Sequence, residues 1–288
     1  MSHDNKSRNP YLSDDGRPIL RPSVVVFLDV LGYQDLVNEA AKQGEAQQFL
    51  EHLHKTLTEA VRLLNAENET MRGFSVFEKD MYRVKTFTDN IVIGYPLLPT
   101  GPDARHDLTG IIMALSLFQT VMATEGLFVR GGISIGNLYM DKTVVYGQGL
   151  MEAHKGEEEL ARDPRLVLTR SAREVAQRHP NDYVDPREHT IYQDSDSQYF
   201  LNYLEYSILI AENEVGPNYE LLVKHKSAIE KELARYQNQP TTWSKFAWAA
   251  QYHNFFCEQH PYFAEEHKID LAKYQMQPRL IINDEIER

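Results

Sequence analysis

The 288-residue sequence has little of what usually places a chain in a class at first sight. It contains one cysteine, Cys257, so no disulfide can form within the chain. No apolar run approaches the roughly 20 residues that a membrane helix needs. The polar, proline-containing residues 1–22 lack the charged-then-apolar pattern of a secretory signal. These absences predict a cytoplasmic protein that has no membrane partner.

Positive charge is also scarce. The chain has 42 acidic residues against 30 lysines and arginines, which gives a formal net charge of −12. A protein that binds nucleic acid along a broad surface would carry a basic face. We therefore expect no nucleic-acid partner, although the net charge does not exclude a local basic pocket for a nucleotide.

The sequence is organised around the apolar run Val24–Leu28, which ends in Asp29 and is followed by Gly32. A short run rich in β-branched residues is typical of a strand that is buried on both faces. Gly32 permits a tight turn before a helical pattern opens at Tyr33, and backbone N–H groups at a helix start attract anions. The stretch therefore indicates either a metal held against phosphates or an aspartate that only caps the helix.

A second segment, Tyr82–Tyr95, has the pattern of a β-hairpin with its turn at Thr88–Asn90. If this hairpin pairs with the strand that ends at Asp29, Asp89 lies beside the end of that strand. Two carboxylates placed in this way suit Mg²⁺ or Mn²⁺, because these ions prefer oxygen ligands and share their coordination with substrate phosphates.

Several segments, taken in order, resemble motifs of the class III nucleotidyl cyclases. Phe27–Tyr33 resembles the first metal motif, and Lys85–Asp89 resembles the second, which contains a base-contacting lysine and a metal aspartate. Arg130–Gly136 resembles the strand that follows, and Tyr146–Gly147 opens what resembles the last motif helix. The resemblance covers roughly residues 24–170 and implies an α+β fold. Its core is of the ferredoxin type, with a mixed sheet flanked by helices, and the C-terminal extension is helical.

The resemblance also implies roles for individual residues. Asp29 and Asp89 would be metal ligands for two Mg²⁺ or Mn²⁺ ions per site, with the backbone of Val30 as a further ligand. The residues implied to bind substrate are Val30, Gly32, Tyr33, Lys85 and Thr88. Because the family's domains pair head to tail, the resemblance implies a homodimer whose active sites are shared between subunits. Taken by itself, Lys85 fits a solvated lysine at a strand edge.

Some positions depart from the family pattern. Thr88 replaces the glycine before the second metal aspartate, and Val144 stands where adenylyl cyclases have the aspartate that reads adenine. Met151 and Lys155 fall at the positions of the transition-state asparagine and arginine. Lys155 keeps the positive charge without arginine's fork, and it is the third candidate catalytic residue after the two aspartates. The missing adenine contact argues against ordinary adenylyl cyclase activity.

Together with the aromatic C-terminal region, these departures resemble the bacterial pyrimidine cyclases of anti-phage Pycsar systems. That resemblance implies conversion of UTP, slightly preferred to CTP, to the 3′,5′-cyclic monophosphate and pyrophosphate. It also implies a separate effector protein that responds to the product. The alternatives are a divergent purine nucleotide cyclase and a catalytically silent module that binds a nucleotide or a partner. A nuclease or phosphatase is weaker, because no histidine or further carboxylate cluster is placed to activate water.

The expected organisation is a flexible leader over 1–22, a catalytic core over 23–182, and an aromatic-rich, mainly helical extension over 183–288 packed on the core. The main elements expected are a strand over 24–29, helices over 33–65, 104–124, 148–161, 219–236 and 243–257, strands over 127–139 and 165–169, and a late strand over 278–282.

Overall fold

The computed structural model describes residues 9–70, 81–97, 105–178, 184–185, 188–205, 208, 210–211 and 214–274. The strands are β1 (Arg21–Val30), β2 (Arg83–Phe87), β3 (Asn90–Pro96), β4 (Val129–Met140), β5 (Val145–Tyr146), β6 (Leu166–Leu168), β7 (Val184–Asp185), β8 (Glu188–His189), β9 (Ile191–Gln193), β10 (Tyr199–Leu201), β11 (Ile210–Ala211) and β12 (Glu214–Val215). The helices are α1 (Tyr33–Gln43), α2 (Ala46–Thr70), α3 (Arg105–Thr124), α4 (Gln148–Glu159), α5 (Arg170–Arg178), α6 (Tyr219–Arg235) and α7 (Pro240–Gln259), with 3₁₀ turns η4 (Glu265–His267) and η5 (Leu271–Tyr274).

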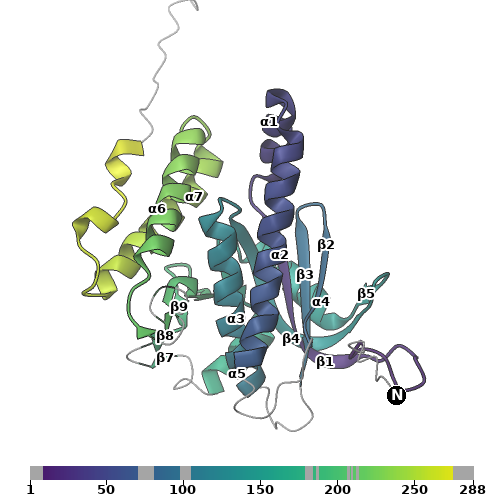
Figure 1. The fold of residues 1–288 in the computed structure, drawn as a ribbon. Helices are drawn as coiled ribbons and strands as arrows, with labels where there is room; N and C mark the ends of the chain where they lie inside the picture. The colour runs from purple at the N-terminus through teal and green to yellow at the C-terminus, as the bar shows by residue number, and fades with distance from the viewer. Residues whose placement is uncertain are drawn as a thin grey trace, which may run out of the picture.

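The largest sheet has the strand order β2-β3-β1-β4-β6-β10-β9, and β5 pairs with β4 outside this path. The β4–β6 pair is parallel, while the other paired neighbours in the sheet are antiparallel. Helices α2 and α3 cover one face, α4 lies on the other, and α6 and α7 stand at the side of the molecule (Figure 1). The expected α+β class with a mixed sheet flanked by helices is confirmed.

Strand β1 lies in the middle of this sheet and is buried on both faces. Val24, Val26 and Leu28 join the large core beneath α2 and α3. Val25 and Phe27 point the other way and join a smaller apolar cluster beneath α4. Because side chains alternate along a strand, Asp29 follows Phe27 onto the α4 face. The site described below is therefore built on that face.

The single helix expected over 33–65 is two helices in the structure. Gly44 adopts a left-handed conformation with φ 75° and ends α1, and α2 begins at Ala46. Glycine at this position closes a helix because it has no Cβ to clash there. The apolar repeat continues through α2, so periodicity alone did not reveal the break.

Two segments outside the expected core take part in the packing. Within the stretch expected as a flexible leader, Tyr11 is anchored to the fold, since its side chain is fully buried and its hydroxyl lies 3.0 Å from Ser23 Oγ, whereas residues 14–18 are exposed. Beyond residue 182, β9 and β10 continue the main sheet through the β10–β6 pair. The strand expected over 278–282 lies outside the described residues.

A buried chain of polar groups joins the C-terminal helices. Tyr203 Oη lies 2.7 Å from His225 Nε2, and His225 Nδ1 lies 3.0 Å from His253 Nδ1. His253 Nε2 lies 2.9 Å from the carbonyl oxygen of His267 and must donate to it. Each imidazole can then be neutral, since His253 Nδ1 accepts from His225 and His225 Nε2 accepts from the Tyr203 hydroxyl. Within the described residues, no helix combines the length and apolar character needed to cross a membrane.

Candidate active site

The structure brings Asp29 and Asp89 to one end of the sheet. In the β1–β3 pair Asp29 lies opposite Asn90, and the Val30 N–H donates to the carbonyl oxygen of Asp89 at 2.9 Å. The two carboxylates interact electrostatically, and the repulsion from Asp89 contributes to a raised pKa of Asp29. Two acidic side chains sixty positions apart in the sequence therefore meet at the carboxyl end of β1.

A basic residue faces the same place from the next strand. Arg130 lies opposite Asp29 in the β1–β4 pair, and its Nε lies 3.1 Å from Asp29 Oδ2. The other end of the guanidinium reaches α4, where Arg130 Nη2 lies 2.7 Å from Glu157 Oε1. Arg130 thus ties the central strand to the helix that covers this face.

One arginine does not fully compensate the two carboxylates that it contacts. Burial raises the pKa of Asp29 above its usual value, although Arg130 opposes the rise. Burial likewise raises the pKa of Glu157 against the attraction of Arg130. Both acids are therefore less stable in charged form than they would be in water. A divalent cation at this position would supply the missing positive charge.

The turn after β1 differs in part from the phosphate cradle expected over 30–33. The Val30 N–H is engaged with Asp89, and the Leu31 N–H donates to the carbonyl oxygen of Phe128 at 2.8 Å, so neither is available to an anion. Gly32 has φ 70°, and a Cβ there would lie 2.8 Å from the Tyr236 hydroxyl, so only glycine fits. The Tyr33 ring packs near Phe49 of α2, with centroids 6.5 Å apart.

The hairpin turn orients the second carboxylate. Thr88 adopts φ 55°, which lies in the left-handed region that glycine adopts readily and other residues adopt rarely. Its hydroxyl lies 2.6 Å from the Phe87 carbonyl oxygen and 2.8 Å from Asp89 Oδ1 and can donate to one of them at a time, while Asn90 Nδ2 donates to Asp89 Oδ1 at 3.0 Å. The threonine thus adopts the strained backbone that a glycine would take and places its hydroxyl within hydrogen-bond distance of the carboxylate.

The remaining sequence candidates lie apart from this cluster within one chain. Lys85 is paired with Val92, which places it on the α4 face, where it interacts electrostatically with Asp141. Lys155 lies on the exposed side of α4 and pairs with Glu159 at 3.7 Å. Both lysines therefore lie outside the Asp29–Arg130–Glu157 group.

Sequence reasoning gave no role to Arg130, Glu157 or Lys245. Arg130 stands at the start of a segment that was matched to the family only as a strand. Glu157 belongs to an acidic run, yet it lies four residues after buried Ala153 and so on the inner side of α4, a spacing that could have singled it out. Lys245 of α7 interacts electrostatically with Asp29, Arg130, Glu157 and Asp163. No local signal marks it.

The oxygen donors fit a hard divalent ion when substrate completes the coordination. In the described part of the chain, no group of three or more His, Cys, Asp or Glu side chains gathers in the arrangement of a metal site. Asp29 and Asp89 would hold the ion, and Mg²⁺ is commonly held by one or two carboxylates together with substrate phosphates.

The fold is similar to the crystal structure of the adenylyl cyclase CyaB from P. aeruginosa, with a TM-score of 0.44 and 13% sequence identity over 63% of this chain and 93% of that chain. At this identity the likeness concerns the fold alone. No family model and no curated protein matches the chain.

Proposed function

We propose that this chain is a metal-dependent nucleotidyl cyclase that converts a pyrimidine nucleoside triphosphate, UTP slightly preferred over CTP, to the 3′,5′-cyclic monophosphate and pyrophosphate. The observation that carries the proposal is the meeting of Asp29 and Asp89 at the end of β1, beside Arg130. These are the acids that the motif resemblance assigns to the metal, and burial raises the pKa of Asp29 although Arg130 opposes the rise.

The reaction asks mainly for positioning and charge neutralisation. The substrate 3′-oxygen bonds to the α-phosphorus, the bond between the α-phosphorus and the bridging oxygen breaks, pyrophosphate leaves, and the hydroxyl proton passes to solvent. Bound Mg²⁺ or Mn²⁺ would supply charge stabilisation and would acidify the hydroxyl. Of this chain's own groups, Asp29 and Asp89 would hold the ion, and Arg130 partly offsets the charge of Asp29.

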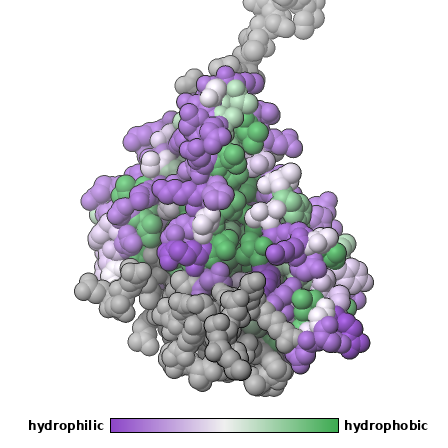
Figure 2. Space-filling view, turned by 45° about the vertical axis from the view of Figure 1, so that its right-hand side comes forward, coloured by the Kyte–Doolittle hydropathy of each residue, from purple (hydrophilic) through white to green (hydrophobic). Residues whose placement is uncertain are grey.

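The proposed enzyme is a homodimer that shares its sites between two copies. Lys85 and Lys155 lie away from the carboxylates within one chain, so a second copy would have to bring them there. Large apolar side chains are exposed on the elements around them: Phe87 by 47%, Val144 by 45%, Tyr146 by 65% and Met151 by 68%. The face of the molecule drawn in Figure 2 shows hydrophobic residues gathered between hydrophilic regions. An exposed apolar patch of this kind is typical of an interaction surface.

In the proposed setting, the cyclic nucleotide is a second messenger of anti-phage defence in the cytoplasm and acts on a separate effector protein. This part rests on the motif resemblance and on the departures at Val144 and Met151. Val144 lies beside Asp141, whose carboxylate accepts from the Val144 N–H at 2.6 Å and interacts electrostatically with Lys85. The polar group next to Lys85 is thus contributed three residues earlier than the family pattern places it.

The proposal is tested by incubating the purified protein with each of the four nucleoside triphosphates and Mn²⁺ and identifying products by mass spectrometry. We expect cyclic UMP or cyclic CMP together with pyrophosphate. Asp89→Asn should abolish the product while preserving the fold by circular dichroism, and Asp15→Asn, on an exposed turn, is the matched control. Conversion of none of the four triphosphates by folded protein would defeat the enzyme hypothesis, and consumption of ATP or GTP alone would favour a purine cyclase.

A catalytically silent nucleotide-binding module is the second candidate. It is favoured by Met151, which stands at the transition-state asparagine position and is 68% exposed. This candidate predicts that UTP binds with Mn²⁺ but is recovered unchanged, whereas a cyclase consumes it.

A further inference from the structure

The C-terminal helices reach the end of β1 through a stack of aromatic rings. The Phe246 ring of α7 lies parallel to Tyr236, with centroids 5.5 Å apart, and meets the edge of Phe128 at 5.3 Å. Both partners touch the turn after Asp29, since the Tyr236 hydroxyl covers Gly32 and the Phe128 carbonyl oxygen accepts from the Leu31 N–H. The first turns of α7 are therefore joined to the turn after β1 through the Tyr236 and Phe128 rings.

Lys245 precedes Phe246 on this part of α7 and is half-buried. Its ammonium group interacts electrostatically with Asp29, Glu157, Asp163 and Arg130, and burial lowers its pKa. A half-buried ammonium normally has a close anionic partner, because removing its water shell is costly. Arg130 contacts Asp29 and Glu157 directly. For Lys245, no carboxylate of the described residues lies within ion-pairing distance.

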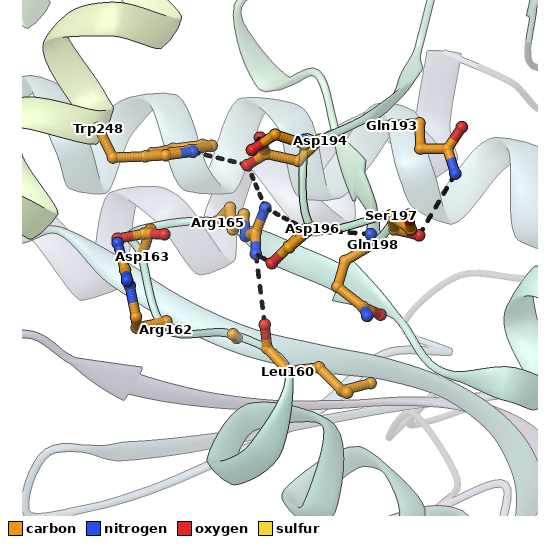
Figure 3. Close-up of polar contacts among 12 residues, drawn as sticks. Leu160, Arg162, Asp163, Arg165, Gln193, Asp194, Asp196, Ser197, Gln198 and Trp248 are labelled. Atoms are coloured by element: carbon orange, nitrogen blue, oxygen red, sulfur yellow. Dashed lines mark hydrogen bonds and ion pairs between the residues drawn. The ribbon is translucent and has the colours of Figure 1, made fainter.

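A second network fixes α7 in this place. Arg165 is fully buried and pairs with Asp194 and Asp196 of the β9–β10 turn (Figure 3). Trp248, three residues after Lys245, donates from its indole N–H to Asp194 Oδ2 at 2.7 Å. The Arg165 carbonyl oxygen accepts from the Gly131 N–H at 3.1 Å. One connected network thus links α7 to the residue next to Arg130, so the position of Lys245 relative to Arg130 is held from two sides.

We propose that Lys245 is a substrate-binding residue that contacts the triphosphate chain, so that the C-terminal helices complete the active site. The inference rests on the proposed function. The geometry that carries it is a half-buried lysine that has no ion pair among the described residues and that lies on a fixed helix near Arg130 and one proposed metal ligand, Asp29. A triphosphate brings more negative charge than one or two divalent ions neutralise, and Arg130 already serves two carboxylates. Lys245 supplies the further cation.

The test compares Lys245→Gln and Lys245→Arg with the wild-type chain, using Lys231→Gln on the exposed side of α6 as the matched control. Binding of inorganic triphosphate in the presence of Mn²⁺, measured by calorimetry, should weaken about tenfold or more in Lys245→Gln, as expected for loss of a hydrogen bond to a charged group. Lys245→Arg should recover most of the affinity, because the charge is restored. The control should bind as the wild type does.

Binding of Mn²⁺ alone separates this role from a structural one. If Lys245 meets phosphate, Lys245→Gln should bind Mn²⁺ as tightly as the wild type or more tightly, because a repelling cation has been removed from the carboxylates. With turnover, KM for the nucleotide should rise by a similar factor. Equal triphosphate affinity in Lys245→Gln and the wild type overturns the inference, as does a wild-type protein that binds no triphosphate.

The two proposals fail separately. Loss of triphosphate binding in Lys245→Gln without turnover of any nucleotide by the wild type would leave Lys245 as an anion ligand and remove the cyclase. Turnover by the wild type with unchanged KM in Lys245→Gln would keep the cyclase and remove the role of Lys245.

Discussion

Two arginines at neighbouring places in the sheet, Arg130 in β4 and Arg165 directly before β6, each contact two carboxylates, with different results. Arg130, whose side chain is 24% exposed, reaches Asp29 and Glu157, and burial still raises the pKa of both acids. Arg165 has no exposed side-chain surface and pairs with Asp194 and Asp196. Although burial opposes it, the hydrogen bond and charge of Arg165 hold the pKa of Asp196 below its usual value.

The difference lies in how completely the charges are satisfied. Asp194 accepts from Arg165, from the Trp248 indole and from the Ser195 backbone N–H, so the protein supplies it with three donors. Asp29 accepts from one arginine and is repelled by Asp89 and Glu157. A carboxylate supplied with several donors by the protein helps to hold the fold together, whereas an under-compensated one can take a cation from outside. Perturbed acids of the second kind are typical of functional sites.

The largest expected effect is a difference in the free energy of unfolding between variants of the two arginines. Arg165→Met leaves two carboxylates without their buried partner and should lower the free energy of unfolding by about 3–5 kcal/mol. Arg130→Met should cost clearly less, because burial already raises the pKa of Asp29 and of Glu157, so both acids can take up a proton when their partner is lost. Urea denaturation of both variants at pH 7 measures the difference. An Arg130 variant that loses as much as the Arg165 variant would break the comparison.

Protonation of the buried histidines His225 and His253, which join the C-terminal helices, should lower the stability of the fold. Burial holds the pKa of His225 well below its usual value and lowers that of His253 to about 4. Below pH 6.5 the two histidines therefore bind protons in the unfolded chain and remain neutral in the folded chain. Stability is fully present above that pH and should fall on the order of 2–3 kcal/mol as the pH drops through about 4.

Urea denaturation between pH 7.5 and pH 4.5 measures this slope. His253→Asn should be less stable at neutral pH and should show a shallower slope, while His54→Asn on the exposed side of α2 should leave the slope unchanged. Equal slopes in the wild type and His253→Asn would contradict the assignment.

Neutralising the under-compensated acid should weaken metal binding without harming the fold. We expect Asp29→Asn to reduce Mn²⁺ affinity by about tenfold or more, by analogy with the loss of groups that support a metal site. The free energy of unfolding should stay unchanged or rise, because the charged form of Asp29 is disfavoured by burial. Calorimetric Mn²⁺ titration and urea denaturation of the same samples check both. Reduced stability with unchanged Mn²⁺ affinity would make Asp29 a structural residue.

The smallest expected effect is a difference in the sign of the stability change with pH between Asp29→Asn and Asp196→Asn. Burial raises the pKa of Asp29 in the folded chain, so on acidification the folded chain takes up a proton at Asp29 at a higher pH than the unfolded chain does. Protonation of Asp29 therefore stabilises the fold at low pH, and this stabilisation is lost as the pH rises through the raised pKa. The pKa of Asp196 is lowered, so its contribution is present above the usual value near pH 4 and is lost as the pH falls further. Relative to the wild type, Asp29→Asn should therefore lose stability on acidification and Asp196→Asn should gain it, measured by urea titration at several pH values.

Much of the site's framework could be read from the sequence. The run before Asp29 predicted the central strand, and the turn residues around Asp89 predicted the hairpin, because burial and turn chemistry are set by neighbouring residues. The break at Gly44 was missed, since the apolar period continued beyond it. Glu157 was not recognised as a site residue because it stands in the acidic run 157–159, and only the packing of α4 shows which of these side chains faces inward.

The sequence by itself determined the α+β class, the central strand and the two acidic side chains at its end, since each follows from local patterns of burial and turn formation. Only the tertiary structure decided that Arg130 stands opposite Asp29, that the N–H groups of Val30 and Leu31 are already used, and that α7 carries Lys245 to the same end of the sheet. Strand register and helix docking depend on contacts between residues far apart along the chain. The sequence around one of these residues therefore does not predict its distant partner.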